Sequence, residues 1–385
     1  MEQARQLWQA LLLRDFAIEA WWQGSFLGRL SGSLRSWGKS SLLVRTSDWI
    51  GLGLVLLYWV FSAQSSTGIL GLILLAGAAL VVLGWLVETP NWLPVHLPLG
   101  LFWGIATLAT ILSPVPYAAR DGWLKLTLYL AGYLLLLRLV RQPRFRDWIV
   151  GSLLLVSLAM GVYGLRQYFY GAAELATWVD PESGLAGLTR VYSYLRNPNL
   201  YGGYLVPLLP LGLAAICIWP SWGVKLLVGF TTAVNFICLV LTYSRGAWIG
   251  GLAALGMMAV LLAQWHTPRL PARWRRWTLP VLLGGGAATL LLAILTVRPL
   301  RLRVQSLFWG RLDTSNNFRI NVWAAVLDMI RDFPILGIGP GNVAFNRVYP
   351  LYQRGNFSAL GAYSVPLQLA VETGFIGSLA FAWFL

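Results

Sequence analysis

Charged residues, histidines and cysteines are all scarce in this sequence. Only 11% of the 385 residues are charged, whereas 57% are hydrophobic. Because charged residues make up about a quarter of an ordinary soluble domain, this balance excludes that class. The chain has only two histidines and two cysteines, and Cys217 and Cys238 both lie in apolar stretches typical of inert core residues. We therefore predict no metal site and expect no cofactor.

Acidic residues are also few. The chain has 14 Asp and Glu against 29 Lys and Arg, a formal net charge of +15. In so apolar a chain, this excess indicates cytoplasmic loops and contacts with membrane lipid headgroups rather than with nucleic acid. Residues 1–47 are basic and amphipathic and lack the apolar core of a cleavable signal peptide.

Long apolar blocks dominate the rest of the sequence. Since about 20 apolar residues cross the hydrocarbon core of a bilayer, we predict an all-α, polytopic transmembrane helix bundle of about ten spans. Nine spans lie within 48–297, and a further one begins in 365–385. The predicted spans are 48–63, 68–87, 94–112, 122–140, 148–165, 199–219, 223–243, 246–264, 279–297 and 366–385. The last block stops at Leu385 without a polar flank, so we expect a longer full-length protein.

The placement of basic residues predicts the orientation. With ten spans, three basic segments fall on one side of the membrane: 1–47, 141–147 and 265–278. The positive-inside rule makes this side cytoplasmic. We therefore expect a multi-pass protein of the cell inner (plasma) membrane with a cytoplasmic N-terminus. The segments 166–198 and 298–364 then lie on the outer side.

The predicted outer loop, 298–364, has a partly helical pattern. Within Phe318–Asp332 the apolar residues recur at three- and four-residue spacing, which predicts an amphipathic helix. The predicted apolar face consists of Ile320, Trp323, Leu327 and Ile330. Ser315 or Asn317 is the predicted N-cap.

Arg319 would then lie in the first turn of that helix, where the helix dipole disfavours a cation unless an anion is nearby. Gly337, Gly339 and Gly341 follow the helix, and such glycines let backbone amides approach a ligand or a membrane surface closely. The alternative interpretation is a helix at the membrane interface whose arginines reach lipid headgroups.

Three further segments carry candidate site residues. Arg245 lies in TYSRGAW (242–248), between two predicted spans, where a guanidinium can clamp a phosphate or carboxylate or anchor the interface. Arg196 and Asn199 lie in YLRNPNLYGGYL (194–205), whose alternative interpretation is an Asx turn and helix cap. Glu372, in LQLAVETG (367–374), lies inside a predicted span, where a carboxylate is costly unless paired. We predict Arg245 or Arg319 as its partner.

These motifs together resemble the O-antigen ligase and polymerase superfamily of bacterial membrane proteins, from about residue 120 to the end. The motifs are NPN-x-x-G-G at 197–203, SRG-A-W at 244–248, R-x-x-x-W with D-x-P-x-x-G-x-G-x-G-N at 319–342, and L-Q-x-x-x-E-T-G at 367–374. A closer similarity covers nearly the whole chain and is to the IctB-type subgroup, cyanobacterial bicarbonate transporters of inorganic carbon accumulation. It rests on ELATWVD (174–180), RVYSYLRNPN (190–199), RLPARWRRW (269–277), SNNFRINVW (315–323) and AYSVPL (362–367).

The superfamily resemblance implies a reaction and its residues. Its ligases transfer a glycan from a polyprenyl diphosphate carrier at the outer face. Two arginines clamp the diphosphate, and a histidine acts as the base. The arginines correspond to Arg245 and Arg319, but the histidine position holds Tyr363. Tyrosine is a poor base near neutrality, so whether the chain is an enzyme stays open.

Two hypotheses remain. In the first, the protein supports bicarbonate transport or accumulation, with Arg245, Arg319 and Arg196 forming an anion site. In the second, it is a glycan ligase or polymerase that acts on polyprenyl-diphosphate-linked sugars. A third interpretation is an accessory subunit without activity of its own.

Overall fold

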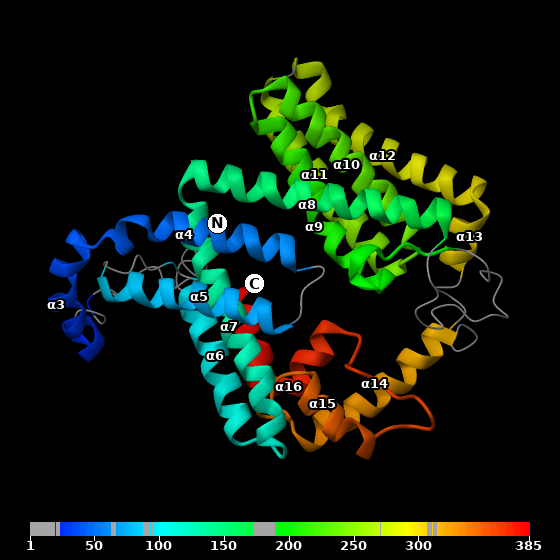
Figure 1. Cartoon of the computed structure of the whole chain (residues 1–385). Helices are drawn as coiled ribbons and strands as arrows, with labels where there is room; N and C mark the ends of the chain where they lie inside the picture. Colours follow the sequence, from blue (N-terminus) through cyan, green and yellow to red (C-terminus); the bar gives the residue numbers. More distant parts are fainter. Residues whose placement is uncertain are drawn as a thin grey trace. The chain divides into compact units, whose positions relative to one another are not determined.

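The structure is a computed structural model of the chain, described for residues 20, 24–62, 67–87, 93, 95–171, 189–269, 271–305, 310 and 314–385. Within these residues the regular secondary structure is entirely helical (Figure 1). The chain forms two compact units. Unit 1 comprises residues 1–58, 65–145 and 315–385, and unit 2 comprises residues 59–64 and 146–314.

Unit 2 interrupts unit 1 in the sequence, so the helices of unit 1 come from separate parts of the chain. Unit 1 contains α3 (Phe26–Ser40), α4 (Leu42–Phe61), α5 (Thr67–Val87), α6 (His96–Ile111), α7 (Pro116–Val140), α14 (Thr314–Asp332), α15 (Asn342–Val348), η4 (Tyr349–Leu351) and α16 (Val365–Phe384). Unit 2 contains α8 (Pro143–Tyr170), η1 (Ser193–Leu195), α9 (Pro198–Ile218), α10 (Trp222–Leu241), α11 (Arg245–His266), η2 (Thr267–Arg269), α12 (Ala272–Thr296) and α13 (Arg298–Gln305). A few terminal residues of α4, α8 and α14 fall in the other unit's range.

The predicted membrane architecture is confirmed. In the described part of the chain, eight helices are long and apolar enough to cross a membrane, and α6 is a shorter apolar helix. The remaining predicted span, 279–297, is covered by α12. Many of their large apolar side chains, such as Leu72 (68% exposed) and Leu226 (71%), are largely uncovered by protein. This is expected of helices that face lipid.

The amphipathic helix predicted at 318–332 is confirmed as α14, but it begins earlier, at Thr314. Ser315 and Asn317 therefore lie inside the helix and do not cap it, and Arg319 lies beyond the first turn. The predicted apolar face was wrong in part. Ile330 is buried, whereas Leu327 is 46% exposed and Trp323 36%.

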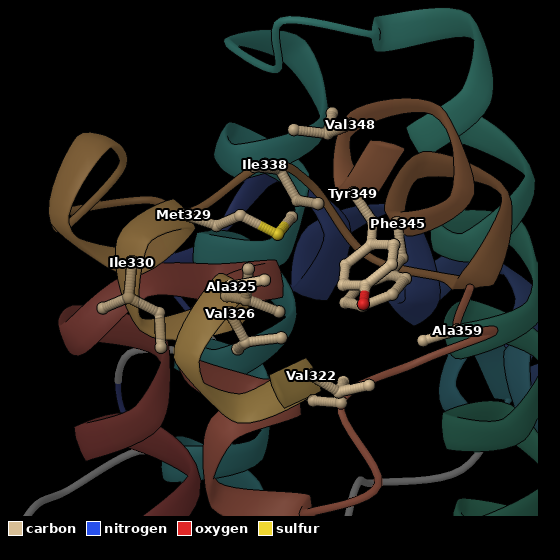
Figure 2. Packing of buried hydrophobic residues seen from close by; sticks show 12 residues of the cluster. Val322, Ala325, Val326, Met329, Ile330, Ile338, Phe345, Val348, Tyr349 and Ala359 are labelled. Atoms are coloured by element: carbon tan, nitrogen blue, oxygen red, sulfur yellow. The ribbon is translucent and has the colours of Figure 1, made fainter. Parts of the chain in front are cut away.

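The buried face of α14 lies one position away from the predicted one (Figure 2). It is formed by Val322, Ala325, Val326, Met329 and Ile330. These smaller side chains pack in one cluster with Ile338 and with Phe345 and Tyr349, whose rings stack at 5.1 Å. Two apolar stripes overlap on α14. The stripe with the smaller side chains allows closer packing, which favours its burial.

The turn after α14 is bound to α16 through backbone hydrogen bonds. The Ile338 and Gly339 amides donate to the carbonyls of Val371 (2.8 Å) and Glu372 (3.0 Å). The Ile338 carbonyl accepts a hydrogen bond from the Ser113 hydroxyl at 2.6 Å. The prediction that glycine amides here approach a ligand or membrane surface is therefore wrong for Gly339. Its amide and its positive φ of 92° serve helix packing instead.

Candidate functional site

Arg245 is the first residue of α11 in unit 2 and is partly buried. The junction that positions it is fixed by short-range hydrogen bonds. The Ser244 amide donates to Thr242 Oγ1 at 3.2 Å, and the Trp248 indole donates to the Leu239 carbonyl at 3.1 Å. The backbone around Arg245 is therefore held before any ligand binds, as an anion clamp requires.

Arg190, which the sequence analysis did not select, reaches the same junction. Its Nε donates to the Thr242 carbonyl at 3.0 Å, and its Nη2 donates to Asn199 Oδ1 at 3.4 Å. The next residue, Val191, donates its amide to the Leu241 carbonyl at 3.1 Å. Segment 189–197, the end of α10 and the start of α9 therefore meet at one end of unit 2. The only sequence signal for Arg190 was its place at the start of RVYSYLRNPN.

Arg196 and Asn199 lie on that same segment and at the start of α9. Arg196 is exposed and adopts a left-handed backbone conformation with a φ of 55°. Asn197 Oδ1 accepts hydrogen bonds from the amides of Asn199 (2.8 Å) and Leu200 (3.4 Å), which confirms the predicted Asx turn and helix cap. Of the predicted site residues of unit 2, Asn199 thus contacts Arg190, and Arg196 and Arg245 lie on segments that reach the same junction.

Tyr363 and Arg319 belong to unit 1. Tyr363 is 48% exposed and holds a left-handed φ of 51°. Its ring packs edge-on against Phe318 at 5.3 Å. Because Arg319 follows Phe318 in α14, the predicted arginine and the residue at the ligase base position lie in one part of unit 1.

Glu372 is largely enclosed in α16 and accepts a hydrogen bond on Oε1 from Gln368 Nε2 at 2.6 Å. The Gly341 amide also donates to it. Gln368 and Gly341, and not the predicted Arg245 or Arg319, are therefore the donors that satisfy this enclosed carboxyl. Gln368 was not predicted as a site residue, although its four-residue spacing from Glu372 indicates that the two side chains can meet on one face of a helix.

The segment after α15 adds an exposed charge cluster. Asp328 accepts from Arg354 at 2.5 Å and from Arg331 at 3.1 Å. These hydrogen bonds, above all that from Arg354, lower the pKa of Asp328. The Tyr352 hydroxyl donates to Asp332 Oδ2 at 2.6 Å, which raises the pKa of Tyr352 to about 12. The contacts of Tyr352 and Arg354 therefore bind residues 352–354 to the C-terminal part of α14.

Among the described residues, no three His, Cys, Asp or Glu side chains are grouped so that they could hold a metal ion. The groups available for chemistry at these positions are therefore guanidinium donors, amides, a phenol and a carboxyl. Such a set can bind an oxyanion strongly through charge-assisted hydrogen bonds.

Two comparisons with known proteins bear on this arrangement. The curated proteins contain no match to the chain. Residues 230–382 match the family model of O-antigen ligase, Wzy_C. The matched stretch includes Arg245, Arg319, Tyr363 and Glu372. The protein is therefore a multi-pass membrane protein that carries an O-antigen ligase domain.

Proposed function

We propose that the protein binds an oxyanion at the outer face of the inner membrane, and that this anion is bicarbonate. In this proposal the N-terminus is cytoplasmic, and the chain takes part in transport or accumulation of inorganic carbon. The resemblance to the IctB-type subgroup supplies the identity of the anion. The arginines supply the binding chemistry, since a guanidinium offers two parallel donors to a planar carboxylate-like group.

One observation carries this choice. The chain keeps both arginines of the ligase pattern, Arg245 and Arg319, but has Tyr363 where the ligases have their base. General base catalysis contributes about a hundred- to ten-thousandfold in rate. A chain that keeps the anion clamp without the base is better suited to binding an anion than to transferring a glycan.

The arrangement in unit 2 supports the same proposal. Arg190, Arg196 and Arg245 place positive charge at one end of the unit, and Asn199 lies beside Arg190. A small oxyanion needs donors from several directions, and these residues come from three different elements. We assign Arg245 as the main anion ligand of this unit and Arg319 as that of unit 1.

The test is uptake of labelled bicarbonate by the purified full-length protein in liposomes under sodium, proton and voltage gradients. Arg245→Ala and Arg319→Ala should each reduce uptake at least tenfold. Arg347→Ala and Arg276→Ala are matched controls, because both arginines are exposed and lie outside the assigned positions. Uptake no higher than in empty vesicles under every gradient would refute direct transport.

A second candidate is glycan transfer from a polyprenyl diphosphate, favoured by the family match over residues 230–382. Here the arginines would bind the diphosphate. The probe is binding of a purified polyprenyl-diphosphate-linked sugar, with Arg245→Ala and Arg319→Ala compared as before. Tyr363→His should then raise transfer about a hundredfold or more. Failure of the wild-type protein to bind the lipid would exclude this candidate.

A further inference from the structure

The side chain of Gln368 connects the enclosed carboxyl of Glu372 to the backbone beside the exposed Tyr363. Its Nε2 donates to Glu372 Oε1 at 2.6 Å, and its Oε1 accepts from the Ala362 amide at 2.5 Å. The Ala362 carbonyl accepts from the Trp323 indole at 2.9 Å. Ala362 is itself fully buried. The peptide units that precede Tyr363 are therefore held from both α16 and α14.

Only an amide satisfies both neighbours of Gln368. The Ala362 amide needs an acceptor, and Glu372, which already accepts from Gly341, is best met by a donor. A glutamine offers one of each at the two ends of the same planar group. A glutamate at position 368 would accept from Ala362 but would put a second carboxyl against Glu372, and a methionine would satisfy neither.

Tyr363 needs such support. Its φ of 51° is a left-handed conformation that a non-glycine residue holds only when its surroundings impose it. The residue is 48% exposed, and its ring packs edge-on against Phe318. The hydrogen bonds to the backbone that precedes Tyr363 constrain it from that side, and Gln368 provides one of them.

We propose that Gln368 is a positioning residue that transmits the position of Glu372 to residue 363. The Glu372 end of this connection is fixed by the Gly341 amide and by the hydrogen bonds between turn 337–341 and α16. The direction in which Tyr363 points then depends on a side chain that is not among the assigned anion ligands. The functional consequence rests on the proposed anion site, whereas the structural connection does not.

The experiment places 3-fluorotyrosine at position 363 of the full chain and records its fluorine resonance. The Phe318 ring makes this resonance sensitive to small displacements. Gln368→Met and Gln368→Glu should shift or broaden the signal. Glu372→Gln should leave it close to wild type, because an acceptor for Gln368 remains.

The double variant that exchanges the two side chains, Gln368→Glu with Glu372→Gln, is the sharpest test. Its new carboxylate at position 368 would accept from the Ala362 amide and from the new carboxamide at position 372, so every hydrogen bond of the pair has a donor and an acceptor again. We expect this exchanged pair to restore the wild-type resonance that Gln368→Glu alone loses. An unchanged resonance in a folded Gln368→Met protein, or no restoration in the exchanged pair, would overturn the proposal.

Bicarbonate uptake by the same variants separates the two proposals. A displaced resonance with uptake reduced at least threefold in Gln368→Met, and regained in the exchanged pair, supports the positioning role. A displaced and restored resonance without any change in measurable uptake supports the connection itself and rules out a role for residue 363 in uptake. A chain without uptake, but with the expected fluorine results, refutes only the proposed function.

Discussion

The backbone of Gly374 lies directly against the backbone of Ile335. A side chain at residue 374 would overlap the Ile335 carbonyl and the Leu336 nitrogen. Gly374 also interrupts α16 with a φ of 64°, and the following residue, Phe375, donates its amide to the Pro334 carbonyl at 2.9 Å. The kink in α16 and the turn after α14 therefore fit together as one backbone contact.

Gly374→Ala should destabilise the protein by about 2 kcal/mol or more. A left-handed non-glycine residue costs about 1–3 kcal/mol, and overpacking costs a further 1–3 kcal/mol or so. The measurement is the thermal unfolding midpoint in detergent. Gly104→Ala, in α6, is the matched control because no atom lies within 4 Å of the added methyl. Equal midpoints for the two variants would contradict the contact.

Asp328 should make the stability of the folded protein depend on pH in the acidic range. Its pKa is lowered in the folded protein, chiefly by the hydrogen bond from Arg354. The stabilisation that Asp328 contributes is therefore present above the ordinary aspartate pKa. It is lost as the pH falls through the lower pKa of the folded protein. The difference in unfolding midpoint between wild type and Asp328→Asn should shrink below about pH 4. A constant difference down to about pH 3 would refute the assignment.

Tyr352 should ionise late, since its hydrogen bond to Asp332 raises its pKa from 10.0 to about 12. Because the pKa is raised, this contact stabilises the fold fully at pH values below the ordinary pKa of a phenol. The stabilisation is lost as the pH rises from there to the pKa of Tyr352 in the folded protein. The check is the phenolate ultraviolet absorbance of wild type minus that of Tyr352→Phe. Asp332→Asn should move the transition back toward the ordinary phenol value, and no movement would exclude Asp332 as the cause.

Arg190→Met should loosen segment 189–197 in unit 2. The variant loses hydrogen bonds to the Thr242 carbonyl and to Asn199. At about 0.5–1.5 kcal/mol each, their loss should speed amide hydrogen exchange of Val191 about tenfold. Arg196→Ala, on the same segment but exposed, should leave this amide unchanged. Similar exchange in both variants would show that Arg190 does not hold the segment.

The sequence predicted features that depend on local composition and spacing. Apolar length alone located α5 and α10, and the Asn-Pro-Asn motif predicted the cap at Asn197. The helix in the predicted outer loop was found, but its buried face was not. Two apolar stripes with the same period overlap there, and periodicity cannot say which of them has a packing partner.

Some residues of the candidate site could be predicted from the sequence, and others could not. The motifs located Arg245, Arg319, Tyr363 and Glu372 by residue type, since guanidinium and carboxyl groups are conspicuous in an apolar chain. Arg190 was not selected, because its role depends on the Thr242 carbonyl, which lies 52 residues away in the chain. Gln368 was not selected, because its role depends in part on the backbone amide of Ala362. A backbone group has no signature in the sequence, so hydrogen bonds to it are invisible until the fold brings the partners together.

By itself, the sequence determined that this is a helical multi-pass membrane protein with an arginine-based candidate site and no histidine at position 363, because chain composition sets how each helix partitions into lipid. Tertiary structure alone decided that Gly337, Gly341 and Gly374 lie against the backbone of neighbouring segments, that Glu372 is satisfied by Gln368 and Gly341, and that Tyr363 is held in a left-handed conformation. Apart from the Gln368–Glu372 pair within α16, these outcomes depend on contacts between segments separated in the chain, whose free energies no local pattern encodes.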